Sequence, residues 1–116
     1  EMSNVKHQEV FNLVYNGLRA QGFRSSLKHN GTCAYRGQDG MKCAIGHLIS
    51  DEDYREEFDG MTNQFDKVMN VVPSLPDAFN FYNQLQVAHD GAESEVDMAY
   101  NLMQFAKTWN LEVPNG

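Results

Sequence analysis

Apolar residues near the start of the chain recur at the spacing of an amphipathic helix. Four of them fall on one side of such a helix: Val10, Phe11, Val14 and Leu18. Gly22 follows, and glycine commonly ends a helix because it adopts the left-handed conformation without a steric penalty. The pattern predicts a helix over residues 4–21 that buries this face and ends at Gly22.

A second helical pattern follows Ser74-Leu75-Pro76-Asp77, which is a typical helix start because proline is tolerated in the first turn. It predicts a helix over residues 76–90, ended by Gly91. The expected inner stripe is Ala78, Tyr82, Leu85 and His89, flanked by Phe79 and Phe81.

A last helix is expected over residues 94–109, beginning near Ser94. Its expected inner face is Val96, Ala99, Leu102, Met103 and Ala106. This choice leaves Met98 outside the core stripe.

The middle of the chain is rich in turn residues. The stretch Gly37-Gln38-Asp39-Gly40 can reverse the chain direction, so residues 32–36 and 41–43 are expected to pair as a short antiparallel β-hairpin. A hairpin of two strands is marginally stable by itself in water, so its apolar side must pack on helices.

Short helical elements are expected around an acidic run. Residues 44–49 resemble a buried helical turn, and Ser50 with Asp53 resembles the start of a capped helix over residues 51–58. Another short helix is expected within residues 62–70, where it would present Phe65, Val68 and Met69.

Together these elements define an α+β fold that is mostly helical, with four to five helices around one short antiparallel β-hairpin. The chain has 116 residues, of which 41% are hydrophobic, and two separate cores would each be too small to be stable. We therefore expect a single globular domain over residues 2–113, with residues 114–116 forming a frayed tail.

The chain contains no run of about 18 apolar residues, and its N-terminus lacks a basic segment followed by an apolar one. This composition predicts neither a membrane partner nor a signal peptide. We expect a protein of the cytoplasm.

The formal charge of −7 is unevenly distributed along the chain. Residues 1–47 carry six basic and three acidic side chains, whereas residues 51–59 are densely acidic. An acidic face repels a phosphate backbone, which argues against direct binding of nucleic acid and suits a protein with a basic surface. The expected binding surface contains Asp51, Glu52, Asp53, Glu56, Glu57 and Asp59. A solvated face without a partner is the alternative.

A metal site is a second possibility. Thiolates and imidazoles are zinc ligands, and the candidate set is Cys33, Cys43, His47 and His89. The spacing lacks the close cysteine pairs of structural zinc sites, and buried cysteines often act as small apolar side chains. For this reason no metal is predicted. The spacing of Gly37, Gly40 and Gly46 matches no phosphate-binding motif, so no cofactor is predicted either.

Nucleophilic catalysis is a third possibility. Cys33 or Cys43, together with His89 and Asp90, supplies the residue types of a Cys-His-acid hydrolase. Adjacent residues on a helix point about 100° apart, so Asp90 is not expected to orient the His89 ring. The sequence therefore favours a protein that is not an enzyme, with a small hydrolase or zinc-binding protein using Cys33, Cys43 and His89 as the alternative.

The stretches CAYRGQDGMKCAIGHLISDEDY and LQVAHD resemble a family of small phage and prophage proteins over residues 8–110. The residues that match its pattern are Cys33, Tyr35, Arg36, Cys43, Gly46, His89 and Asp90. Ser50 replaces a proline that is usual in that family, and His47 stands where Ala or Cys is equally common. The resemblance implies a phage accessory protein in the cytoplasm of an infected bacterial host, and it names no activity.

Four of these residues are expected to form a structural polar network that locks the hairpin to a helix, with Arg36 paired to Asp90 and His89 paired to Tyr35. The leading hypothesis is a non-enzymatic module that binds a host protein through the acidic surface, and the host protein would be a defence or nucleic-acid-processing factor.

Overall fold

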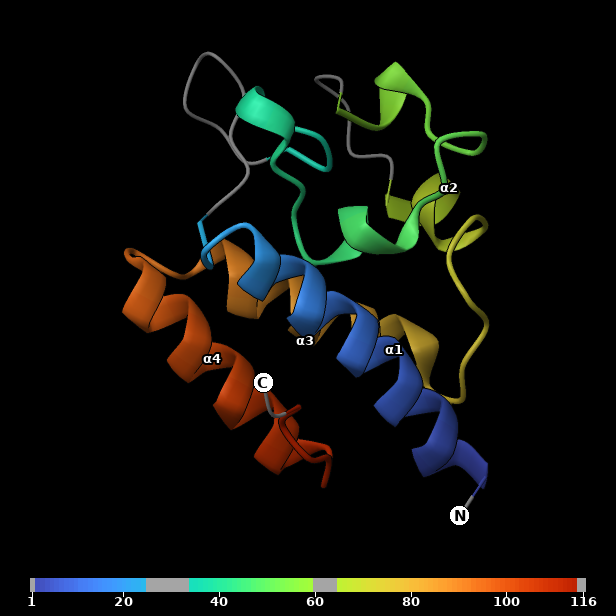
Figure 1. The fold of residues 1–116 in the computed structure, drawn as a ribbon. Coiled ribbons are helices and arrows are strands. Elements are labelled where there is room, and N and C mark those ends of the chain that lie inside the picture. Colours follow the sequence, from blue (N-terminus) through green and yellow to red (C-terminus); the bar gives the residue numbers. More distant parts are fainter. Residues whose placement is uncertain (1, 25–33, 60–64, 115–116) are drawn as a thin grey trace.

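The computed structural model describes residues 2–24, 34–59 and 65–114, and Figure 1 shows their arrangement. The α-helices are α1 (Met2–Ala20), α2 (Phe65–Met69), α3 (Ala78–Asp90) and α4 (Glu95–Thr108). Three short 3-10 helices lie between α1 and α2: η1 (Gln38–Gly40), η2 (Ile45–Leu48) and η3 (Glu56–Asp59).

The three long helices, α1, α3 and α4, lie together and form what we call the helical layer (Figure 1). The described residues between 34 and 75 lie over one side of this layer and contain only short helices, so we call them the irregular half. The irregular half contacts the layer mainly where η2 packs against α1 and α3.

An aromatic cluster joins the three helices of the layer. The ring of Phe105 from α4 lies 5.7 Å from that of Phe11 and 5.0 Å from that of Phe81. His7 from α1 stacks on Phe81 at 4.6 Å, and its Nε2 lies 2.8 Å from the Pro76 carbonyl oxygen. Each helix therefore contributes rings to one buried core.

Two helix ends follow the chemistry expected from the sequence, whereas α3 begins at Ala78 rather than at Pro76. Gly22 has a φ of +73°, and the Phe23 N–H donates to the Leu18 carbonyl, so α1 ends in the predicted left-handed turn. Ser94 caps α4 by accepting a hydrogen bond from the Asp97 N–H at 3.1 Å.

The predicted inner face of α1 is confirmed, because all four of its expected core residues are buried. In α3, Tyr82, Leu85 and His89 are fully buried as expected. Phe81 is buried too, whereas Phe79 is 56% exposed.

The predicted inner face of α4 is wrong in part: Leu102 and Ala106 are buried as expected, whereas Val96 and Met103 are exposed. The buried residues are Met98, Leu102, Phe105 and Ala106, whereas Val96 is 78% exposed. Two apolar stripes of equal spacing run along this helix, one through Met98 and Phe105 and the other through Val96 and Met103. The larger ring of Phe105 is the one that packs against α1 and α3.

The predicted β-hairpin is also wrong, and with it the α+β class: no strand occurs among the described residues, and the fold is helical. One antiparallel bridge joins Arg36 to Lys42, around the turn that η1 forms. Pairing extends no further because the Tyr35 N–H, which the next pair would need, donates to the Asp59 side chain, and η2 begins two residues after Cys43.

The helix expected over residues 51–58 is absent as well. Ser50 does accept a hydrogen bond from the Asp53 N–H at 3.1 Å, as a helix cap would. The first turn is not continued, and η3 is the only helix in this stretch. Neighbouring carboxylates would repel one another on the surface of a longer helix. In addition, the Tyr54 hydroxyl donates a hydrogen bond to the Asp59 side chain.

Candidate functional site

Asp59, expected on the acidic surface, instead holds the irregular half together. Its carboxylate accepts hydrogen bonds from the Tyr35 N–H at 2.6 Å and the Arg36 N–H at 3.2 Å. It also accepts one from the Tyr54 hydroxyl. A side chain at the end of η3 therefore binds two consecutive backbone N–H groups, and a longer β-ladder would need that of Tyr35. We call this arrangement the Asp59 clasp.

Arg36 continues the clasp toward the surface. Its guanidinium group lies over the Tyr54 ring, 4.5 Å from the ring centroid. Its Nη2 lies 2.7 Å from the Asp51 carboxylate and 3.3 Å from the Ile49 carbonyl oxygen. The expected pairing with Asp90 is therefore wrong, because Arg36 binds the acidic segment rather than α3.

The Tyr54 hydroxyl donates its proton to the hydrogen bond with Asp59 and does not ionise. Burial raises its pKa, and the hydrogen bond to Asp59 and the charge of that carboxylate raise it further. The hydroxyl thus stays protonated at every physiological pH, so the clasp does not open by ionisation of this tyrosine.

The other five predicted binding residues are exposed, and we call residues 51–57 the acidic loop. The members of this set are Asp51, Glu52, Asp53, Glu56 and Glu57. Asp51 pairs with Arg36, and Glu57 pairs with Lys67 at 2.7 Å. The Lys67 contact lowers the pKa of Glu57, so this carboxylate is ionised at neutral pH.

Arg55 lies inside the acidic loop but is used to shape it. Its guanidinium group donates to the backbone carbonyls of Glu52 and Tyr54, at 2.9 and 3.0 Å. Glu52, Asp53 and Glu56 have no ion pair among the described residues. The loop therefore presents a concentrated negative charge to solvent.

Cys43 is a buried thiol without nucleophilic character. It is fully buried, and its sulfur accepts a hydrogen bond from the Gly46 N–H at 3.2 Å. Burial raises the thiol pKa to about 12, so the thiolate is negligible at neutral pH. Burial likewise raises the pKa of the adjacent Tyr35 to about 12. Cys43 therefore acts as a packing residue.

His89 and Asp90 form a dyad, contrary to the expectation that adjacent helical residues cannot pair. His89 Nδ1 lies 2.9 Å from Asp90 Oδ1, and Gln86 Nε2 donates to the same oxygen at 3.0 Å. These residues occupy the last turn of α3, where the carboxylate can fold back over the imidazole. Asp90 thus orients the buried ring, which is what a catalytic base would need.

His47 faces α1. Its Nε2 lies 3.1 Å from Gln21 Oε1, and its ring lies directly against Gly17. Burial, followed by the charges of Lys42 and His89, lowers its pKa from 6.5 to about 4. His47 is therefore neutral at pH 7 and forms part of the contact between η2 and α1.

No group of three or more His, Cys, Asp or Glu side chains within residues 2–24, 34–59 and 65–114 is arranged to hold a metal ion. Cys33 lies outside the described residues. The metal and catalytic sets that include Cys33 therefore stay predictions.

Two glutamines that the sequence did not predict as functional residues connect the helical layer to the irregular half. The Gln21 side chain accepts from the Lys42 N–H and donates to the Lys42 carbonyl. The Gln86 oxygen accepts from the Ile45 N–H at 3.2 Å. Gln21 lies in the turn after α1 and Gln86 lies in α3, and both are half-buried neutral amides. Such residues carry no periodic or charge signal, so only their proximity to the irregular half reveals this role.

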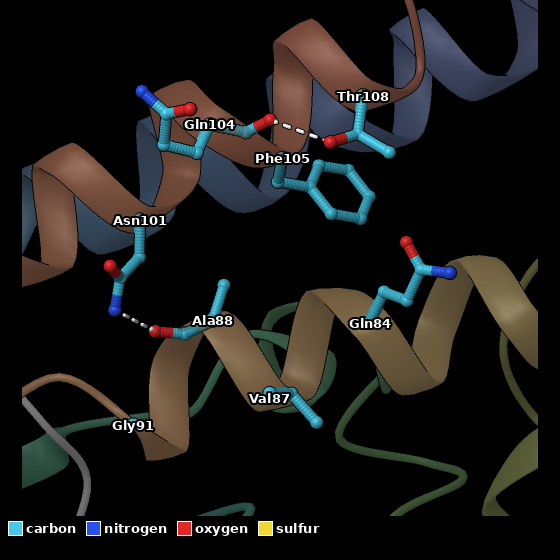
Figure 2. Close-up of a pocket in the computed structure, with 8 residues that line it drawn as sticks. All are labelled: Gln84, Val87, Ala88, Gly91, Asn101, Gln104, Phe105 and Thr108. Carbon is cyan, nitrogen blue, oxygen red and sulfur yellow. Dashed lines mark hydrogen bonds between the residues drawn. The ribbon is translucent and has the colours of Figure 1, made fainter.

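A shallow groove of about 350 Å³ lies between α3 and α4, and Figure 2 shows its lining. Phe105, Val87 and Ala88 provide its apolar part. Two of its three side-chain amides are engaged, since Asn101 donates to the Ala88 carbonyl and Gln84 accepts from the Trp109 indole. The lining contains no titratable side chain, and its one hydroxyl, that of Thr108, donates to the Gln104 carbonyl with no base beside it.

Comparisons with protein-family models, with curated proteins and with solved structures find no match for this chain. Within the described ranges, no helix has both the length and the apolar character needed to span a membrane.

Proposed function

We propose that this protein is a non-enzymatic binding module that captures a partner protein through the acidic loop. The observation that carries the proposal is that exposed carboxylates are combined with supports that are buried, as Phe58 is, or half-buried, as Tyr54 and Asp59 are. Asp59, Tyr54 and Phe58 lie against the body of the molecule, whereas the acids between and before them face solvent. A loop fixed in this way loses little conformational entropy when it binds.

The partner's surface is basic. The loop carries three carboxylates without an ion pair in the described part of the chain, and they would accelerate encounter with a positively charged surface. The same charges would repel a phosphate backbone, so the partner is a protein rather than a nucleic acid. The resemblance to phage and prophage proteins suggests that the partner is a host defence or nucleic-acid-processing factor.

The test is a charge reversal with a matched control. One variant carries lysine at Glu52, Asp53, Glu56 and Glu57, and the control carries lysine at four exposed acids elsewhere: Glu9, Asp39, Asp66 and Glu112. Both variants have the same net charge. We expect the wild type and the control to capture the same protein from bacterial lysate, and we expect the loop variant to lose at least about 100-fold in affinity. Equal capture by both variants would refute the proposal.

One observation favours the alternative, a small hydrolase: the His89–Asp90 dyad has the geometry of a base and its orienting group. Cys43 is unsuitable as its nucleophile because the thiol is buried and its pKa is raised, which leaves Cys33. His89 is fully buried, which opposes the alternative.

Titration of the thiols in the native protein separates the two functions. A hydrolase requires that Cys33 react rapidly with an electrophile and that His89→Gln slow this reaction. A binding module predicts only that the rate of the Cys33 reaction does not change with His89→Gln. In a Cys33→Ala variant, Cys43 should react only after denaturation. Elemental analysis for zinc tests the metal alternative on the same samples.

A further inference from the structure

The outer face of α4 carries an exposed apolar stripe that neither the core nor the acidic loop uses. Val96, Tyr100 and Met103 are 78%, 55% and 39% exposed, and they follow one another at intervals of four and three residues. They therefore lie on one face of the helix, turned away from Phe105, which packs into the core. In Figure 1, α4 lies at an edge of the molecule, and the exposure of the three side chains shows that this face is uncovered among the described residues.

The charges beside the stripe differ at its two ends. Lys107 lies one helical turn beyond Met103, and Glu93 lies just before the first turn of α4. No described residue forms an ion pair with either side chain. The stripe itself is uncharged, so it presents an acidic end, an apolar centre and a basic end.

If the α4 helices of two copies lie antiparallel, the acidic end of each stripe meets the basic end of the other, and the two apolar centres meet. We propose that α4 pairs with α4 of a second copy of this chain across a twofold axis near Tyr100. In that arrangement Val96 of one copy faces Met103 of the other, and Lys107 approaches Glu93 of the other copy. The helix dipoles are antiparallel as well. The twofold axis repeats each favourable contact, as in other isologous interfaces.

The resulting dimer is weak. One pair of helices of this length buries less than the roughly 1,200 Å² of a standard interface, and the charge of −7 on each copy opposes association. We expect a dissociation constant between about 10 µM and about 1 mM. The dimer does not depend on the proposed function, because α4 and the acidic loop are separate segments.

Sedimentation velocity over about 10 µM to about 1 mM tests the pairing. The wild type should move from monomer toward twice its mass as concentration rises, and Tyr100→Glu should stay monomeric. Leu13→Glu is the matched control, because Leu13 is 61% exposed and lies on a different helix, α1, and this variant should dimerise normally. Val96→Lys is a second disruptive variant, so the test does not depend on the folding of one protein.

The orientation is tested by exchanging charges. Lys107→Glu should weaken the dimer by about tenfold, because each dimer contains the contact twice. Adding Glu93→Lys to the same chain should restore it. A wild type that is monomeric at the highest concentration would overturn the proposal, and so would dimers that survive Tyr100→Glu or a charge exchange that fails to restore them. Reversal of the acidic loop removes most of the net negative charge of each copy, so it should not weaken the dimer.

Discussion

The helical layer and the irregular half are held together by different kinds of contact. In the layer, apolar side chains from α1, α3 and α4 interlock, and the aromatic rings of Phe11, Phe81 and Phe105 meet in one cluster. In the irregular half, side chains bind the backbone directly, as Asp59 does at Tyr35 and Arg36.

Two kinds of interaction therefore specify this fold: burial of apolar side chains in the layer, and hydrogen bonds from single side chains to the backbone in the irregular half. Burial of apolar surface is roughly additive and depends on spacing, so many residues share it. A charge-assisted hydrogen bond to a backbone N–H depends on one side chain in one position. We therefore expect the layer to dominate stability and the irregular half to be sensitive to a few single substitutions.

The largest effect should come from the layer. Phe81→Ala removes a fully buried ring that touches His7, Phe105 and Trp109, and it should lower the free energy of unfolding by about 3–5 kcal/mol. Urea denaturation followed by circular dichroism measures this loss. Phe79→Ala, on the same helix but 56% exposed, should cost less than about 1 kcal/mol. Similar losses in the two variants would contradict the assignment of the core.

A smaller effect should come from the Asp59 clasp. Asp59→Asn keeps the shape of the side chain but replaces the charged carboxylate that accepts three hydrogen bonds. It should lower the free energy of unfolding by about 2–3 kcal/mol. Hydrogen exchange should quicken at the Tyr35 and Arg36 amides while those of α4 remain protected. Asp53→Asn, at an exposed position, is the control. If exchange quickens equally in α4, the two parts of the molecule unfold together.

The contact between the two parts gives a third prediction. A methyl group on Gly17 would lie 2.5 Å from Nδ1 of His47, so Gly17→Ala should destabilise the protein by about 1–2 kcal/mol even though alanine favours helix. Combining it with His47→Ala removes the clash and should recover most of the loss. Thermal unfolding of the single and double variants measures this coupling, and strict additivity would argue against the contact.

The smallest effect should be the pH dependence of His47. Its pKa is about 4 in the folded protein and near 6.5 in the unfolded chain, so between these values only the unfolded state binds the proton. Stability is therefore fully present above pH 6.5 and falls as the pH is lowered toward 4. Because the ring is only partly buried, solvent screening limits the loss by pH 5 to about 1 kcal/mol.

A His47→Gln variant isolates this contribution. Glutamine can still donate to Gln21 but does not titrate between pH 7 and pH 5. The urea midpoint of the wild type should fall more than that of the variant over this range. Parallel curves for the two proteins would show that His47 is equally solvated in both states.

The same contrast explains which elements the sequence predicts. The inner face of α1, the caps at Gly22 and Ser94 and the core residues Tyr82 and Leu85 follow from local spacing and local chemistry. The inner face of α4 does not, because Val96 and Met103 repeat as regularly as Met98 and Phe105. Only packing against α1 and α3 decides between the two stripes.

The β-hairpin and the helix over residues 51–58 fail for a different reason. Both predictions treat their segments as independent, yet Asp59 takes the N–H groups of one segment while Tyr54 of the other donates to it. Residues about 24 positions apart thus change each other's local structure, which no local pattern records. The exposed part of the acidic surface was predictable from charge alone, whereas the inward role of Asp59 was not.

Trp109 is the only tryptophan of the chain, and its position makes it a natural optical reporter. The indole lies 5.1 Å from the His7 ring and 5.0 Å from the Phe81 ring, and its N–H donates to Gln84. Its fluorescence therefore senses whether all three long helices are assembled, without any attached dye. Thermal unfolding of the layer can be followed by this fluorescence, and unfolding of the irregular half by the reactivity of the Cys43 thiol. Comparison of the two curves would show whether the protein unfolds in one step or two.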